Sequence, residues 1–158
     1  LAHEGKAYSD DVDVGIMVET PAAAIMTPVL AKYVDFFSIG TNDLVQYTLA
    51  VDRGNANISY LYNHFNPAVL RLVQRTISSA RENGIWAGMC GEMASDPNAA
   101  VLLMAMGISE LSMSAPSIPR VKEKIRSISS VKAKEILADV MAMEDGDDIR
   151  NYLQKILG

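Results

Sequence analysis

A single cysteine and a shortage of basic residues are the first restrictions that the sequence sets. With one thiol, Cys90, the chain cannot form an internal disulfide, and a lone thiol between glycines suits a reducing compartment. The 14 lysines and arginines are outnumbered by 19 aspartates and glutamates, giving a formal net charge of −5, and they form no stripe. A surface for nucleic acid or for an anionic membrane is therefore not predicted, and small molecules or proteins are the expected partners.

Long apolar runs are missing as well. No run approaches the roughly 20 residues of a membrane span, and the first residues lack the charged-then-apolar pattern of a signal peptide. We therefore expect no membrane insertion and a cytoplasmic location. The 158 residues, 49% of them apolar, suffice for the core of one ordinary domain. The chain begins at Leu1 without a methionine, as expected of a segment cut from a longer polypeptide.

A short apolar strand followed by a helix is the unit that recurs along the chain, four times in all. Such runs are typical of strands covered on both faces, and we expect them at residues 12–18, 34–39, 85–89 and 110–114. Helices are expected from Pro21, where Pro28 should kink or split the helix, and from near Leu44. Further helices should follow the caps Asn66 and Asp96, ending at Gly84 and Gly107, with closing helices at residues 118–128, 131–143 and 147–157.

Four strand-helix units predict a parallel α/β sheet, because parallel strands need crossover connections and these are right-handed. Both a doubly wound sheet and part of a barrel fit this pattern. A full eight-unit barrel needs about 250 residues, and the four units here fill little more than residues 1–125. The pattern favours half a barrel, whose open edges and inner apolar face require further chain or a second copy to cover them.

Three of the expected strands lead to reactive side chains: Glu19, Asp43 and Cys90. Either carboxylate has a simpler interpretation as a cap or first-turn acid of the following helix. Residues 40–43 also offer backbone N–H groups at a helix start, which suits phosphate oxygens. Two carboxylates beside such a cradle suit Mg²⁺, which takes a few carboxylates plus substrate oxygens.

Cys90 and Arg53 each have more than one interpretation. A free cysteine is usually a buried small residue, whereas Gly88 and Gly91 around Cys90 allow close approach, so the thiol can serve as a nucleophile or proton donor. Arg53 can pair with Asp52, face solvent, or bind a phosphate or carboxylate in a bidentate manner. His3 and His64 are both expected to be surface residues.

Three segments, GIMVETPAA, FFSIGTNDLVQYTLAVDRGN and GMCGEMASDP, resemble the phosphoenolpyruvate-utilising enzymes, and among them the enzyme I group of the bacterial sugar phosphotransferase system. Pyruvate phosphate dikinase and phosphoenolpyruvate synthase share the general pattern and are the alternative. The resemblance implies the second half of a phosphoenolpyruvate-binding TIM (β/α)₈ barrel that binds Mg²⁺. It implies metal-binding roles for Glu19 and Asp43, substrate contacts from Asn42, Asp43 and Arg53, and an acid role for Cys90.

The same resemblance also implies binding partners. They are phosphoenolpyruvate and pyruvate, a second subunit in a homodimer, and a phosphocarrier protein engaged through an amino-terminal region. The motif of the phosphorylated histidine and the arginines of the first half barrel are absent from the sequence. We therefore expect residues 1–158 alone not to complete phosphotransfer. A metal-dependent lyase or aldolase and a non-catalytic dimerisation module are the competing classes.

Overall fold

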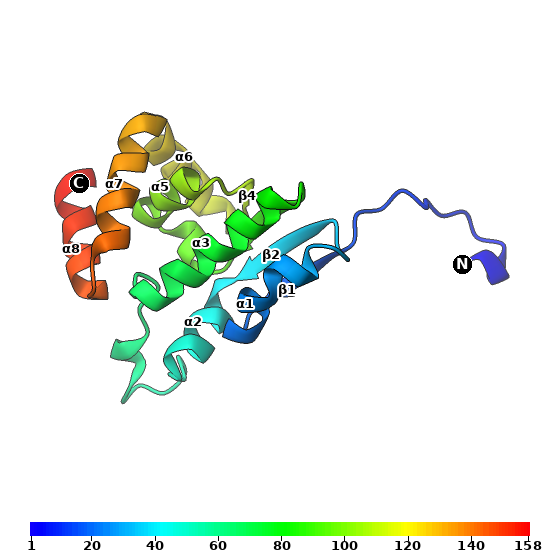
Figure 1. The fold of residues 1–158 in the computed structure, drawn as a ribbon, viewed down its shortest axis with the longest axis horizontal. Coiled ribbons are helices and arrows are strands. Elements are labelled where there is room, and N and C mark those ends of the chain that lie inside the picture. The colour runs from blue at the N-terminus through cyan, green and yellow to red at the C-terminus, as the bar shows by residue number, and fades with distance from the viewer.

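A single parallel sheet of four strands organises the computed structural model, which describes residues 1–158 (Figure 1). The strands are β1 Gly15–Val18, β2 Phe36–Gly40, β3 Trp86–Cys90 and β4 Glu110–Leu111. They lie in the order β1-β2-β3-β4, and each neighbouring pair is parallel. The prediction of an α/β fold with four parallel strand-helix units is confirmed, and sequential parallel strands are the arrangement of part of a (β/α) barrel.

Helices connect the strands and close the chain. The elements between the strands are α1 Pro21–Leu30, α2 Thr41–Leu49, η2 Ser59–Leu61, α3 Pro67–Glu82, α4 Glu92–Ser95 and α5 Pro97–Met106. After β4 come η3 Ala115–Ser117, α6 Ile118–Arg126, α7 Ser130–Ala142 and α8 Gly146–Leu157, while η1 Ala2–Glu4 begins the chain. The three closing helices lie around α5, at the end of the molecule away from the projecting N-terminal segment (Figure 1).

Local capping sets where the helices begin, as the sequence predicts. The side chains of Asn66 and Asp96 accept hydrogen bonds from Ala68 N and Asn98 N at 2.9 and 2.8 Å. Of the predicted kink or split at Pro28, the split does not occur, because α1 runs as one helix to Leu30. Pro28 cannot donate to the carbonyl of Ala24 four residues earlier, and the hydroxyl of Thr27 donates to that carbonyl instead, at 2.9 Å.

The outer strands are shorter than predicted. β1 begins at Gly15, opposite Phe36, because the N–H of Val14 donates to the Asp35 side chain, at 2.7 Å, and not to a backbone carbonyl of a neighbouring strand. Val12 and Val14 are accordingly 64% and 66% exposed. β4 pairs with β3 at two positions, so the strand predicted for residues 110–114 is reduced to Glu110–Leu111.

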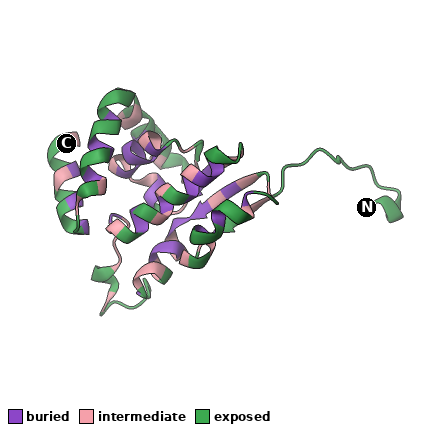
Figure 2. Cartoon of the chain, viewed as in Figure 1, coloured by how far each residue is buried: buried purple, intermediate pink, exposed green.

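One face of the sheet is covered by helices and the other is open. Buried residues gather where the helices meet the sheet, and Phe37 and Ile39 of β2 belong to that core (Figure 2). At alternate positions the side chains face away from these helices: Met17 is 48% exposed, and the half-buried rings of Phe36 and Trp86 stack with centroids 4.3 Å apart. The uncovered inner face predicted for a half barrel is therefore present. None of the helices is long and apolar enough to cross a membrane.

Candidate functional site at the carboxyl ends of the strands

The ends of β1, β2 and β3 lie side by side. Gly40 is paired with Cys90 across β2 and β3, and Val18 is paired with Ile39 across β1 and β2. Glu19 follows Val18, and its side chain crosses Gly40, where an added Cβ would stand 2.7 Å from the carboxylate oxygen Oε1. Only a glycine leaves room for the Glu19 side chain at this position. The predicted grouping of Glu19 with the β2 end and Cys90 is therefore present in the structure.

The Glu19 carboxylate does not cap the next helix. Thr20 is the N-cap of α1 and accepts a hydrogen bond from Ala23 N at 3.2 Å. Asp43 lies in the first turn of α2. The N-cap residue of this helix is Gly40, so no side chain caps it. Neither carboxylate forms an ion pair with another residue. The capping interpretation is wrong for Glu19, and Asp43 retains a first-turn position with its oxygens unpaired.

Thr41 and Asn42 join the end of β2 to the turn after β3. The Thr41 hydroxyl donates to the carbonyl of Cys90 at 2.8 Å, and the Asn42 side-chain carbonyl accepts from Glu92 N at 3.0 Å. Gly91 lies between these contacts with φ of 100°, and an added Cβ would stand 2.5 Å from Thr41 Oγ1. The contact with Glu92 orients the Asn42 amide so that its Nδ2 hydrogens are free to donate to an oxyanion.

Cys90 is half-buried, so its interpretation as a core residue is wrong. Its sulfur lies 3.7 Å from the carbonyl of Ile39 and 3.9 Å from the Met17 sulfur, which is on the open face of the sheet. The thiol is therefore at the edge of the uncovered face, and the end of β2 lies between it and Glu19. A small ligand lying along this edge can reach it.

Arg53 is exposed in the segment that follows α2, and its N–H donates to Gln46 Oε1 at 3.3 Å. The predicted alternative of an ion pair with Asp52 is not formed. Asp52 Oδ1 instead accepts from Gly54 N at 2.8 Å.

Tyr62 is a residue of this region that the sequence did not indicate. Its hydroxyl donates to the Asn42 carbonyl at 3.1 Å. Burial of the ring raises the pKa of Tyr62, the Glu92 carboxylate raises it further, and the Arg53 guanidinium opposes both. The hydroxyl therefore lies among charged groups from the segment after α2 and from the end of β3.

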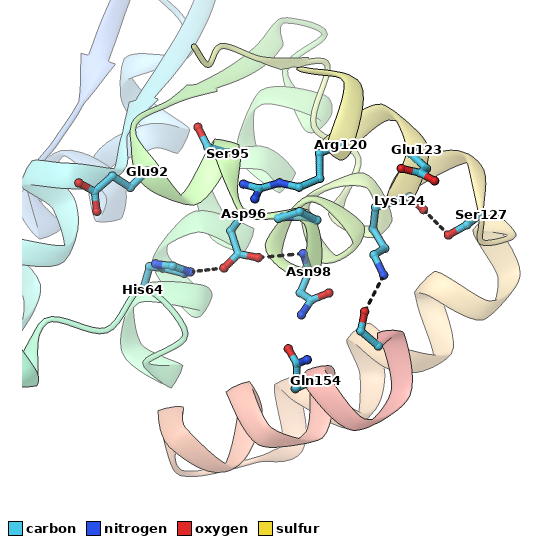
Figure 3. Close-up of a pocket in the computed structure, with 12 residues that line it drawn as sticks. His64, Glu92, Ser95, Asp96, Asn98, Arg120, Glu123, Lys124, Ser127 and Gln154 are labelled. Carbon is cyan, nitrogen blue, oxygen red and sulfur yellow. Dashed lines mark hydrogen bonds and ion pairs between the residues drawn. The ribbon is translucent and has the colours of Figure 1, made fainter. Parts of the chain in front are cut away.

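A pocket lies beside this edge, between α4, the start of α5 and the helices α6 and α8 (Figure 3). It measures about 790 Å³ and has no hydrophobic residue in its lining. Glu92 contributes to the lining but points away from the middle of the pocket, whereas Arg120 and Gln154 point into it (Figure 3). The lining of the pocket includes none of Glu19, Asp43 and Cys90, so the predicted site lies outside it.

His64 lines the same pocket, and its prediction as a surface residue is wrong. Its side chain is 18% exposed, and Nε2 lies 3.2 Å from Asp96 Oδ2. Burial raises the pKa of Asp96, but the hydrogen bond from His64 and the N–H groups of Ala99 and Asn98 lower it by more, so the net shift is downward. The pair ties the loop before α3 to the start of α5. His3, in η1, is exposed as predicted.

The family model of the PEP-utilising enzymes, in its PEP-binding domain, matches residues 1–130. The chain belongs to this family. It is 55% identical over 139 residues to a phosphoenolpyruvate-protein phosphotransferase of Haemophilus influenzae, covering 88% of this chain and 24% of that protein. It is 49% identical over 157 residues to the enzyme of the same name from Buchnera aphidicola, covering 99% and 28%. The chain thus spans about a quarter of the length of the curated relatives that it matches.

The donor set at the strand ends fits a hard cation such as Mg²⁺. Glu19 and Asp43 offer unpaired carboxylate oxygens, and no group of three or more His, Cys, Asp or Glu side chains is arranged to hold a metal. Mg²⁺ is commonly bound through one or two carboxylates plus water and substrate phosphate oxygens. The residues therefore suit a metal held jointly by protein and substrate, and do not suit a structural metal site.

Proposed function

We propose that this chain forms one side of the phosphoenolpyruvate site of a phosphoenolpyruvate-protein phosphotransferase. Such an enzyme moves the phosphoryl group of phosphoenolpyruvate to one of its own histidines and then to a carrier protein for sugar uptake, releasing pyruvate. The observation that carries the proposal is the placement of Glu19, Gly40 and Cys90 side by side at the strand ends. Family membership supports the ligand class.

Glu19 and Asp43 would hold Mg²⁺, which neutralises charge on the phosphoryl oxygens when it is bound. The Nδ2 hydrogens of Asn42, oriented by the contact of its carbonyl with Glu92 N, donate to ligand oxygens. The Arg53 guanidinium binds the phosphate or the carboxylate as a bidentate donor. These groups would orient the substrate and stabilise the charge that moves during transfer.

Cys90 would supply the proton that completes the reaction. The bridging C–O–P unit breaks at the P–O bond, the phosphoryl group goes to a histidine outside this chain, and the enolate of pyruvate is left. The electron pair of the enolate double bond takes the thiol proton at the methylene carbon, which gives pyruvate and a Cys90 thiolate. The half-buried thiol at the edge of the site supports this role.

The partners of the whole enzyme remain proposals for this chain. They are a second subunit in a homodimer and a phosphocarrier protein reached through the amino-terminal part of the enzyme, in a cytoplasmic setting. The uncovered face with Met17, Phe36 and Trp86 supports association, because an exposed apolar sheet face calls for a covering partner. The same uncovered face also favours a second candidate function, that of an association module without catalytic activity.

Titration of the chain with phosphoenolpyruvate, with and without Mg²⁺, tests the proposed function. We expect Mg²⁺-dependent binding that Asp43→Ala reduces by at least about tenfold, the equivalent of one lost charge-assisted contact. Asp13→Ala, which removes a carboxylate from the exposed N-terminal segment, should bind as the unaltered chain does. Equal binding by Asp43→Ala would contradict the metal assignment, and turnover of phosphoenolpyruvate by this chain alone would contradict the one-sided site.

A further inference from the structure

The segment that carries Arg53 extends beyond the end of α2 as a series of turns. Its hydrogen bonds are mostly internal: Asp52 Oδ1 accepts from Gly54 N, and Asn55 Oδ1 accepts from Asn57 N. Residues 52–57 are exposed, so packing does not fix their position. An arginine on such a segment binds a ligand weakly unless the segment is held in place, because ordering it costs free energy on binding.

Tyr62 lies where this segment returns to the body of the molecule, just after η2. Its ring packs against the hydrophobic core, and its hydroxyl donates to the carbonyl of Asn42 at 3.1 Å. Asn42 belongs to the first turn of α2, beside Asp43. One hydrogen bond therefore joins the far end of the Arg53 segment to the main chain of the residues proposed to bind substrate and metal.

We propose that Tyr62 is a positioning residue, whose hydroxyl holds the Arg53 segment in place over the ends of the strands. The hydrogen bond from Tyr62 to Asn42 is the structural basis of this inference. The expected effect on phosphoenolpyruvate binding rests on the proposed function. The Arg53 guanidinium opposes the rise in the pKa of Tyr62 that burial and Glu92 cause, which is consistent with the two side chains lying in one region. Gln46 provides the second attachment, at the other end of the segment.

Tyr62→Phe tests the inference, because it removes the hydroxyl and keeps the packed ring. The matched control is Tyr60→Phe, since Tyr60 lies two residues away, is 78% exposed and bonds to no other group through its hydroxyl. Two measurements are made on each full 158-residue chain. One is backbone amide hydrogen exchange of residues 51–61 without ligand, and the other is the affinity for phosphoenolpyruvate and, separately, for Mg²⁺ alone.

Loss of one net hydrogen bond predicts about threefold to tenfold faster exchange in residues 51–61 of Tyr62→Phe, and a similar loss of phosphoenolpyruvate affinity. Affinity for Mg²⁺ alone should stay unchanged, since Glu19 and Asp43 are not altered, and Tyr60→Phe should change neither quantity. A general structural defect would weaken both ligands together and would overturn the inference. Unchanged exchange in Tyr62→Phe would also overturn it. If the unaltered chain binds no phosphoenolpyruvate, the proposed function is contradicted, while the exchange measurement still decides the role of Tyr62.

Discussion

The side-chain carbonyl of Asn42 accepts a hydrogen bond from the backbone N–H of Glu92 at 3.0 Å, which couples the turn after β2 to the turn after β3. This contact uses the acceptor of the amide and leaves both donors free. The two Nδ2 hydrogens are the groups that we propose to donate to ligand oxygens. The first prediction follows from this orientation.

Asn42→Asp keeps the acceptor for Glu92 N and replaces two donors with negative charge. We expect affinity for phosphoenolpyruvate to fall by more than about tenfold, because the new carboxylate repels the ligand where a donor was available. Isothermal titration measures the affinity. Asn57→Asp makes the same chemical change in the exposed segment after α2 and should lower the affinity far less.

Gly91 is the residue whose backbone the coupled turns restrict most. Gly91→Ala places a Cβ 2.5 Å from Thr41 Oγ1 at a φ of 100°, and we expect it to lower the free energy of unfolding by more than about 2 kcal/mol. Gly84→Ala is the control that isolates the cost of backbone strain from that of the steric clash with Thr41. Gly84 also has a positive φ, of 73°, but no atom lies within 4 Å of an added Cβ. It should cost about 1 kcal/mol. Equal losses in urea unfolding would mean that the contact with Thr41 is not tight.

Cys90 should react with a small alkylating reagent in the folded chain, because its thiol is half-buried at an open edge. Saturating phosphoenolpyruvate with Mg²⁺ should slow the reaction several-fold, since the ligand would lie over the sulfur. Mass spectrometry of the modified chain gives the rate. A rate that is the same with and without ligand would place the ligand elsewhere.

The Asp96 carboxylate should make stability depend on pH. Its pKa is lowered in the folded chain, so the unfolded state binds the proton more readily, and the stabilisation present at neutral pH is lost as pH falls below about 4. Asp96→Asn keeps an N-cap side chain and removes the charge. We expect it to cost about 1 kcal/mol at pH 6 and less at pH 3.5, measured by urea unfolding at both values. If the loss of unfolding free energy in Asp96→Asn is the same at both pH values, Asp96 acts as a helix cap alone and its charge does not contribute.

The parts that the sequence predicts are those encoded over short distances along the chain. Strand-helix alternation and the caps Asn66 and Asp96 involve neighbouring residues, and the strand ends bring Glu19 and Cys90 together because parallel strands end at one edge. Contacts between distant residues could not be read in this way: His64 meets Asp96 across 32 positions, and Tyr62 meets Asn42 across 20. The apolar pattern at residues 12–18 predicts a strand that is too long, because it does not reveal that the Asp35 side chain takes the N–H of Val14.

The most direct measurement of the central claim, that three strand ends form one ligand site, uses Mn²⁺ in place of Mg²⁺. In the presence of phosphoenolpyruvate, paramagnetic broadening of amide NMR signals should centre on residues 19–20, 41–43 and 90–92, and Glu19→Ala should abolish it. Broadening that instead centres on the acidic turn at residues 144–148, or that is unchanged in Glu19→Ala, would contradict the account.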